Sequence, residues 1–349
     1  MQLRSSVLSV QGGIWDEVRV LGLLIPTAML GVLVRLALTS LTSYSSPKLA
    51  PVLYSQALGC VVIGIGTGVK PTLEWMWVTL CTCRRPINLT SLIDLSVAIN
   101  TGFCGSLTTF STFMLDVFKA YTYITPSGYV ARNAKGATFD VIGEVIATAG
   151  ISIASVQLGL GIGRAIQGSI HLPESTSDTS KSHRARKITS TTAAIILAIA
   201  AYVIALALAL SPSTASTRQW TYALLFAPAG AYTRHKLAQL ANKGVLPWGT
   251  LTSNVLGCIF TSLGFGLVHL QGSAMSSAVR CNVLHALQDG LGGALSTVSS
   301  LAAELNTLGV SRKSTAYAAL SVLLGQAACI VVAGSMKWSE MGFGEACGG

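Results

Sequence analysis

Long apolar runs dominate the chain, and short polar segments separate them. Helices that cross a hydrocarbon core of ~30 Å need roughly 20 such residues each. The pattern therefore predicts an all-α polytopic membrane protein with nine spans, at residues 18–40, 50–70, 90–118, 139–165, 190–211, 219–241, 247–270, 285–306 and 314–336.

Composition and charge agree with this prediction. Of the 349 residues, 51% are hydrophobic and only 10% are charged, which is not typical of a soluble enzyme. The net charge of +10 comes from Lys and Arg residues in the loops and at span ends, so we interpret it as a topology signal and not as a nucleic-acid surface. Most of these cations lie in cytoplasmic loops if the N-terminus is cytoplasmic, and we expect this orientation, in the plasma membrane. The first run shows no clear cleavage site, so we expect it to start insertion itself.

Several motifs occur twice in the same order. GFCGSLTTFSTFMLD at 102–116 aligns with GLGGALSTVSSLAAE at 290–304. SQALGCVV at 55–62 aligns with SNVLGCIF at 253–260, and the two Gly-x-x-x-Arg pairs end at Arg35 and Arg234. The alignment pairs Gly105 with Gly293, Thr108 with Ser296, Ser111 with Ser299, and Asp116 with Glu304. The chain therefore contains an internal duplication.

An odd span between the copies predicts their relative orientation. Each copy has four predicted spans, so a fifth span between them inverts the second copy, which gives a pseudo-twofold axis in the membrane plane and a site near mid-membrane. The predicted organisation is an N-terminal tail (1–17), a first repeat (18–166), a polar linker (167–187), an inverting linker span (188–211), a second repeat (219–336) and a C-terminal tail (337–349).

Glycines and hydroxyls interrupt the third span near its middle. Gly102, Gly105 and the following hydroxyls are typical of a broken helix, which a membrane tolerates only where the free backbone groups find partners. Carbonyl groups at two facing breaks could bind a small cation. Close helix packing is the commoner role of Gly and Ser in membrane helices, and spacing favours it here.

Aromatic and amide side chains mark candidate positions on the same spans. Phe110 and Phe113 share one helical face, where their positive ring edges could attract an anion, although core packing is the usual role. Asn254 lies mid-span, with Gln56 at the corresponding place in the first half. A buried amide needs a partner, so Asn254 either donates to an anion or joins two helices.

Further polar groups accompany them. Tyr317 and Ser321 lie one turn apart and extend a possible track of hydroxyl donors. Asp116 and Glu304 are carboxylates at equivalent positions, where they can act as helix caps, in ion pairs or in transport.

Catalytic chemistry is not indicated. The five histidines form no paired motif, and no phosphate loop, nucleophile elbow or metal cluster is present, so we do not expect an enzyme. The eight cysteines include no Cys-x-x-Cys pair, and we interpret most of them as small apolar packing residues.

These motifs together resemble the Fluc fluoride channels, also called CrcB. The resemblance rests on GFCGSLTTFSTF, the Gly-x-x-x-Arg ends of the spans, APAGAYTRHKL and LPWGTLTSNVLGC. The fused nine-span form is similar to the eukaryotic fluoride exporters, called FEX. The resemblance implies a passive, fluoride-selective channel that exports cytoplasmic fluoride, and a single chain that replaces the antiparallel dimer of the bacterial members.

The resemblance also implies roles for particular residues. The fluoride pore would be lined by Phe110, Phe113, Asn254, Tyr317 and Ser321. A central structural sodium ion would be bound by Gly105, Thr108, Gly293 and Ser296. Supporting positions would be Ser111, Thr112, Gln56, Asp116, Glu304, Arg35 and Arg234.

The two halves depart from the family pattern in different places. Val298 and Leu301 replace the phenylalanines in the second half, and Gln56 replaces the asparagine in the first. The economical hypothesis is one competent pore and one degenerate pore.

Two other functions are compatible with the pattern. One is a proton-coupled secondary transporter of a small solute, with Asp116, Glu304, Asp94 or Glu144 as relay groups. The other is a membrane scaffold in which every motif serves packing.

Overall fold

A computed structural model describes residues 14–43, 50–69, 96–122, 134–169, 180–211, 214–270 and 277–339, together with Phe343 and Cys347. These ranges are helical throughout most of their length and contain no strand, apart from an isolated bridge between Leu270 and Phe343. The predicted all-α class is confirmed.

The first half of the chain builds four helical segments, the third of which is interrupted. These are α1 (Ile14–Thr42), α2 (Val52–Gly68), the run η1 (Ala98–Cys104), α5 (Gly105–Leu107) and α6 (Phe110–Thr122), and α7 (Ala134–Ser169). They overlap the first four predicted spans. The start of the third span, residues 90–95, lies outside the described residues.

The second half repeats this order after one additional helix. That helix is α8 (Ser180–Leu210), and α9 (Ala215–Ala241) and α10 (Trp248–His269) follow it. The interrupted segment consists of α11 (Ala278–His285), η2 (Ala286–Gly292), α12 (Gly293–Leu295) and α13 (Val298–Leu308). The last segment consists of α14 (Arg312–Cys329), η3 (Ile330–Gly334) and α15 (Ser335–Lys337).

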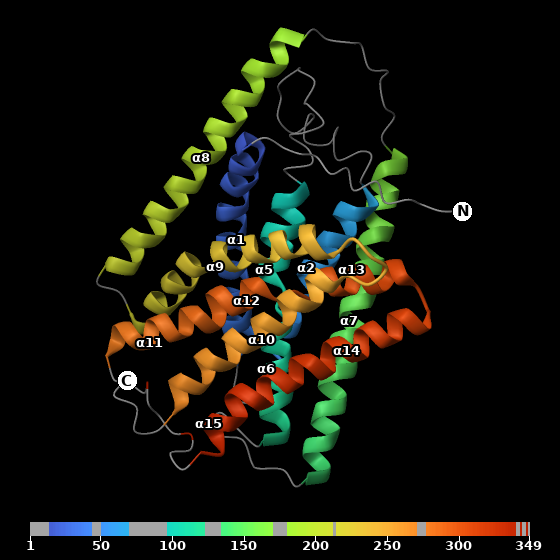
Figure 1. The fold of residues 1–349 in the computed structure, drawn as a ribbon, viewed down its shortest axis with the longest axis vertical. Coiled ribbons are helices and arrows are strands. Elements are labelled where there is room, and N and C mark those ends of the chain that lie inside the picture. The colour runs from blue at the N-terminus through green and yellow to red at the C-terminus, as the bar shows by residue number, and fades with distance from the viewer. Residues whose placement is uncertain are drawn as a thin grey trace.

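The helices of the two halves cross each other. In Figure 1, α1, α2, α6 and α7 run along the long axis, and α9, α10, α13 and α14 pass obliquely across them. In each half, the helix that follows the interruption packs against the other half. α6 contacts α10 and α14, and α13 contacts α2 and α7. The two halves therefore share one interior.

Glycines bring α2 and α7 into direct backbone contact. A Cβ on Gly64 would overlap the carbonyl oxygen of Val156, and a Cβ on Gly159 would overlap that of Val61. Small residues at such contacts let helix backbones approach closely in membranes. The backbones of α2 and α7 therefore touch each other at these glycines.

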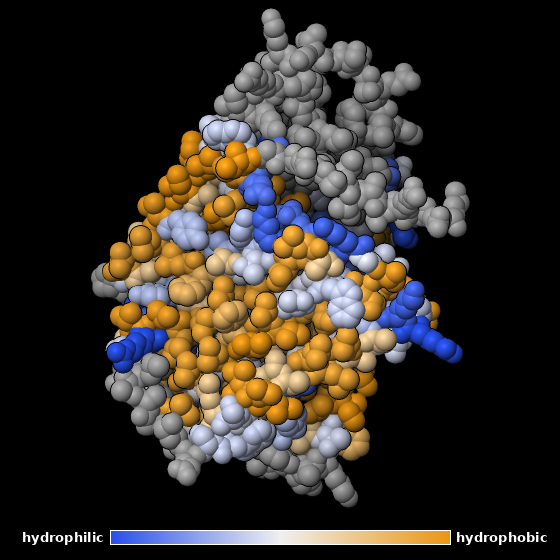
Figure 2. Space-filling view, viewed as in Figure 1, coloured by the Kyte–Doolittle hydropathy of each residue, from blue (hydrophilic) through white to orange (hydrophobic). Residues whose placement is uncertain are grey.

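The outer surface is strongly apolar. Within the described residues, five helical segments are long and apolar enough to cross a membrane, namely Ile14–Thr42, Gly136–Gly168, Thr191–Leu210, Trp248–His269 and Arg312–Lys337. Ile146 on α7 and Ile196 on α8 are each 66% exposed, and hydrophobic residues cover much of the described surface in Figure 2. An apolar surface of this extent is typical of contact with lipid.

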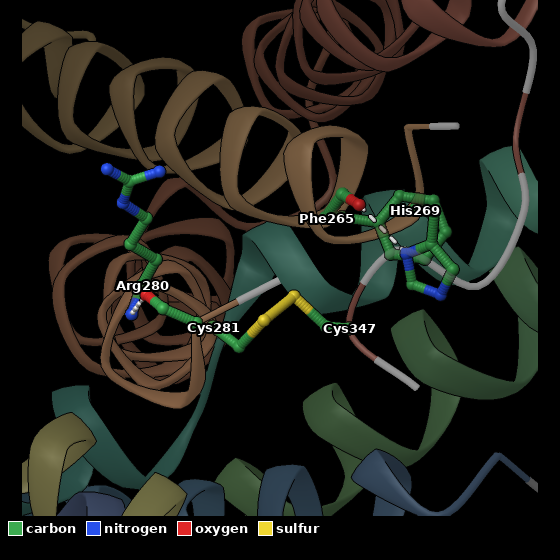
Figure 3. Close-up of a disulfide and its surroundings, with 6 residues drawn as sticks. Phe265, His269, Arg280, Cys281 and Cys347 are labelled. Carbon is green, nitrogen blue, oxygen red and sulfur yellow. Dashed lines mark hydrogen bonds between the residues drawn. A yellow bond between two sulfur atoms is a disulfide. The ribbon is translucent and has the colours of Figure 1, made fainter. Parts of the chain in front are cut away.

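The described cysteines fall into two groups. Cys60, Cys104, Cys258 and Cys329 are buried and reduced, as expected for packing residues. Cys281 at the start of α11 forms a disulfide with Cys347 near the C-terminus. Figure 3 shows this disulfide close to Phe265 and His269 at the end of α10.

Candidate functional site

Two matching helix breaks lie at the centre of the molecule. Thr108 has extended backbone angles (φ −92°, ψ 144°) between α5 and α6, and Ser296 has nearly the same angles (φ −92°, ψ 154°) between α12 and α13. These two residues are aligned in the sequence duplication. Of the two interpretations of the third span, helix packing and a helix break, the structure shows a break, at Thr108, and the second half contains its counterpart.

The residues after each break start the next helix. Thr297 Oγ1 accepts a hydrogen bond from Ser300 N at 3.3 Å, and Thr109 Oγ1 accepts one from Thr112 N at 3.3 Å. Threonine is a favourable cap because its oxygen satisfies a backbone N–H that has no partner within the helix. Thr112, predicted as a supporting residue, therefore contributes its backbone to a helix cap.

Hydroxyl groups join the two breaks to each other. Ser299 N donates to Thr108 Oγ1 at 3.1 Å, and Ser111 N donates to Ser296 Oγ at 2.9 Å. The side chains repeat the pairing, since Thr108 Oγ1 donates to Ser299 Oγ at 3.0 Å and Ser296 Oγ donates to Ser111 Oγ at 2.9 Å. All four residues are fully buried. Each contact thus has a counterpart related by the sequence alignment.

Two amide side chains bind the backbone of the breaks. Gln56 donates from Nε2 to Thr109 O at 2.7 Å, and its Oε1 accepts from Thr109 N at 3.2 Å. Asn254 does the same with Thr297, at 3.3 Å and 2.8 Å. Both amides are fully buried. Each one satisfies a donor and an acceptor that the broken helix leaves without partners inside the membrane.

Two buried arginines reach the same region. Arg35 on α1 donates to Ser106 O at 3.0 Å and also to Asp289 O. Arg234 on α9 donates to Gly105 O at 2.5 Å and Ser296 O at 3.3 Å. Each arginine therefore binds carbonyl groups of both halves.

The sodium prediction can be compared with these contacts. Two of its four predicted ligand residues, Gly105 and Ser296, use their carbonyl oxygens to accept hydrogen bonds from Arg234. A sodium ion would need those same oxygen atoms and would lie beside a guanidinium. The residues in this arrangement do not fit a bound sodium ion, which stays a prediction from the resemblance.

The two phenylalanines lie on α6, where it meets the second half. Phe110 and Phe113 are buried, with ring centroids 6.0 Å apart and ring planes at 80°. This arrangement points the edge of one ring at the face of the other. A Cβ on Gly325 of α14 would lie 2.8 Å from Phe110 Cε1, so the glycine makes room for the ring.

Tyr317 on α14 and Glu304 on α13 form a buried polar pair. Tyr317, 1% exposed, donates from its hydroxyl to Glu304 Oε2 at 2.8 Å, and Thr250 Oγ1 donates to Glu304 Oε1 at 2.6 Å. Ser321 lies one turn further along α14 and donates to Tyr317 O at 2.8 Å. Glu304 also lines a surface depression of about 320 Å³ beside Asn242. Glu304 thus lies between this depression and the hydroxyl of Tyr317.

Asp116, the sequence counterpart of Glu304, has a different partner. It forms an ion pair with Lys119 at 3.1 Å, and Lys119 Nζ lies 5.0 Å from the centre of the Phe265 ring. Both members of the pair are about one-quarter exposed. The two aligned carboxylates therefore occupy different environments.

Two related sets of helices in the interior differ in their packing. Gln326 on α14 donates to Met114 O on α6 at 2.7 Å, and Gln157 on α7 donates to Asn306 on α13. SVQLG at 155–159 aligns with SVLLG at 321–325, so Gly159 corresponds to Gly325. Gly325 makes room for the Phe110 ring, whereas Gly159 lies against the backbone of α2.

Two buried polar residues of α7 were not singled out from the sequence. Thr148 and Ser152 are each 1% exposed on a helix that is otherwise largely open. Their four-residue spacing inside an apolar run was the signal. Thr250 was also missed, although it lies one turn before Asn254.

The sequence matches a known family over both halves. The family profile described as CrcB-like protein, Camphor Resistance (CrcB), covers residues 23–160 and 221–334. The chain belongs to the CrcB-like family. Its two matched regions coincide with the two copies recognised from the motifs.

Named relatives of this CrcB-family chain are fluoride proteins. Fluoride export protein 1 of Candida albicans is 31% identical over 89% of this chain and 78% of its own length. Fluoride export protein 1 of Schizosaccharomyces pombe is 28% identical over 90% of this chain and 94% of its own length. Fluoride-specific ion channel FluC 1 of Streptomyces avermitilis is 32% identical over 30% of this chain and 86% of its own length, so it is similar in size to one half. No solved structure matches the chain.

Proposed function

We propose that this chain is a passive fluoride-selective channel that lets cytoplasmic fluoride leave the cell down its electrochemical gradient. The names of its relatives support the choice of ion, and the family is one of channels and exporters, not of enzymes. The observation that carries the proposal is that Phe110 and Phe113 of α6 and Tyr317 of α14 belong to one buried cluster, where α6 packs against α10 and α14.

The chemistry of this pathway suits a small, strongly hydrated anion. Hydroxyl and amide groups and aromatic edges can replace water around the ion. On α6, α10 and α14 these groups are Phe110, Phe113, Tyr317 and Ser321, with Asn254 beside the break. None of these five side chains carries a formal positive charge that would hold the anion too tightly.

We propose that only this pathway conducts. The related pathway between α2, α7 and α13 has Val298 and Leu301 in place of the phenylalanines. Its helices α2 and α7 also meet through glycines, backbone against backbone. Gln56 binds its helix break as Asn254 does, so the break keeps its structure although the pathway is closed.

Nine spans and an inverted repeat form the architecture that accompanies this function. Gln56 and Asn254 make equivalent contacts with the two helix breaks, and Thr108 and Ser296 accept equivalent hydrogen bonds from the opposite half. These matching contacts support a pseudo-twofold relation between the halves. One chain would then form the complete channel, with lipid around α7 and α8. We place it in the plasma membrane, with its N-terminus in the cytoplasm.

The disulfide supports this orientation. Cys281 lies between the seventh and eighth predicted spans and Cys347 follows the ninth, so both lie on the same side of a nine-span protein. With a cytoplasmic N-terminus this side is extracellular, where disulfides form and persist.

A flux experiment tests the function. The full chain, reconstituted in liposomes, should release fluoride when potassium and valinomycin set the membrane potential and both sides have equal pH. Phe113→Ile should lower this flux, whereas Leu301→Ile, the matched change in the second half, should leave it unchanged. Absence of fluoride release from correctly folded protein contradicts the proposal.

A proton-coupled transporter is the alternative, and no observation favours it. Of its proposed relay groups, Asp116 is paired with Lys119, and Glu144 accepts from Thr148 at 3.3 Å. Glu304 accepts from Tyr317 and Thr250, and Asp94 lies outside the described residues. Fluoride flux that saturates and requires a proton gradient would establish that alternative.

A further inference from the structure

The buried arginines lie where the two halves meet. Arg35 and Arg234 each end a Gly-x-x-x-Arg motif, and each is only 3% exposed. A charged side chain at this depth in a membrane protein is costly unless it is bound by other groups. The partners of these guanidiniums therefore indicate what the charges do.

Most of the acceptors of Arg234 are carbonyl oxygens of the first half. Nη1 donates to Gly105 O at 2.5 Å, and Nη2 donates to Thr101 O at 2.5 Å. Nη1 also lies 3.3 Å from Ser296 O at the second break. One guanidinium therefore binds the broken segments of both halves at once, as a cation placed between them would.

Arg35 has a related position. Its guanidinium donates to Asp289 O in the second half and to Ser106 O in the first. Asp289 and Thr101 occupy matching places in the sequence duplication, so the two arginines bind equivalent carbonyl groups in opposite halves. The positive charges are thus part of the pseudo-symmetric centre.

Gly105 and Gly293, which are aligned in the duplication, lie directly against these guanidiniums. A Cβ on Gly105 would lie 2.5 Å from Arg234 Cζ, and a Cβ on Gly293 would lie 2.8 Å from Arg35 Cζ. Any larger residue at either place would displace the arginine. The absence of side chains at Gly105 and Gly293 is explained by the guanidiniums without a metal ion.

We propose that Arg234, together with Arg35, is the cation that stabilises the paired helix breaks in this chain, and that no sodium ion is bound between the halves. Carbonyl dipoles at the two breaks point toward a shared region and need a positive charge or donors. The guanidiniums supply both. A further cation beside two guanidiniums would be repelled strongly in this low-dielectric interior.

Thermal unfolding of the purified full-length chain tests the proposal. The midpoint should be the same, within about 1 °C, in sodium chloride and in N-methyl-D-glucamine chloride at equal ionic strength. Fluoride release from liposomes should also persist without sodium. A midpoint that falls by several degrees when sodium is removed, or flux that then stops, overturns the proposal.

Variants provide the second part of the test. Arg234→Ala should unfold at least about 5 °C below Arg312→Ala, a matched change at an exposed position of α14. Equal midpoints for the two variants would overturn the proposal. If Arg234→Ala does not fold, the sodium comparison on the unmodified chain still decides. If fluoride release is absent both with and without sodium, the result counts against the proposed channel function. The thermal unfolding midpoints test the role of the arginine independently of that function.

Discussion

Gly325 on α14 lies directly against Phe110 on α6, so that a Cβ on the glycine would be 2.8 Å from Phe110 Cε1. The residue aligned with Phe110 in the second half is Val298. One half therefore has an aromatic ring packed against a glycine at a place where the other half has a valine.

Gly325→Val should therefore disturb the conducting pathway. The added carbons overlap the Phe110 ring and Met114, and overpacking of this kind costs about 1–3 kcal/mol. We expect fluoride flux per folded protein to fall at least about tenfold, measured in liposomes. Gly161→Val on α7 is the control, because its Cβ would meet nothing within 4 Å. Equal flux from both variants would show that the position of Phe110 does not matter.

Tyr317→Phe removes the hydroxyl that donates to Glu304. Loss of a hydrogen bond to a charged group costs about 1.5–3 kcal/mol, so we expect lower flux with a small decrease in the unfolding midpoint. Tyr54→Phe, at an exposed position on α2, should change neither quantity. Fluoride release that is unaffected by Tyr317→Phe would exclude this hydroxyl from the pathway.

Asn254→Asp and Gln56→Glu are matched changes at the two helix breaks. Each replaces the amide nitrogen that donates to a carbonyl of the helix break, so both should lower the free energy of unfolding by about 2 kcal/mol or more. Only Asn254→Asp should increase the fluoride sensitivity of cells that depend on this protein at normal expression. Equal sensitivity from both changes would mean that Asn254 acts only on the break.

The disulfide offers a test of orientation and stability. A membrane-impermeant reductant added to intact cells should expose Cys281 and Cys347 to an impermeant maleimide, whereas buried Cys60 should stay unlabelled. The double change Cys281→Ser, Cys347→Ser should lower the free energy of unfolding by about 2–4 kcal/mol. Labelling that requires permeabilised cells would reverse the proposed orientation.

Local pattern was sufficient for much of the fold. Apolar run lengths predicted where the described helices lie, and the aligned motifs predicted both the break at Thr108 and its counterpart at Ser296. Thr148 and Ser152 were missed, because their four-residue spacing inside an apolar run does not show whether the hydroxyls face the interior or the lipid. Their burial depends on which face of α7 meets the rest of the molecule.

The sequence by itself determined the class of protein, the duplication and the residues that differ between its halves, since these depend on hydropathy and residue type. Only the tertiary structure decided which partners the polar groups have. Asn254 and Gln56 bind the same backbone groups, Glu304 binds Tyr317 while Asp116 binds Lys119, and Arg234 occupies carbonyls that the resemblance assigned to sodium. The physical reason is that a hydrogen bond joins atoms brought together by packing across the two halves, and spacing along one helix carries no information about the other.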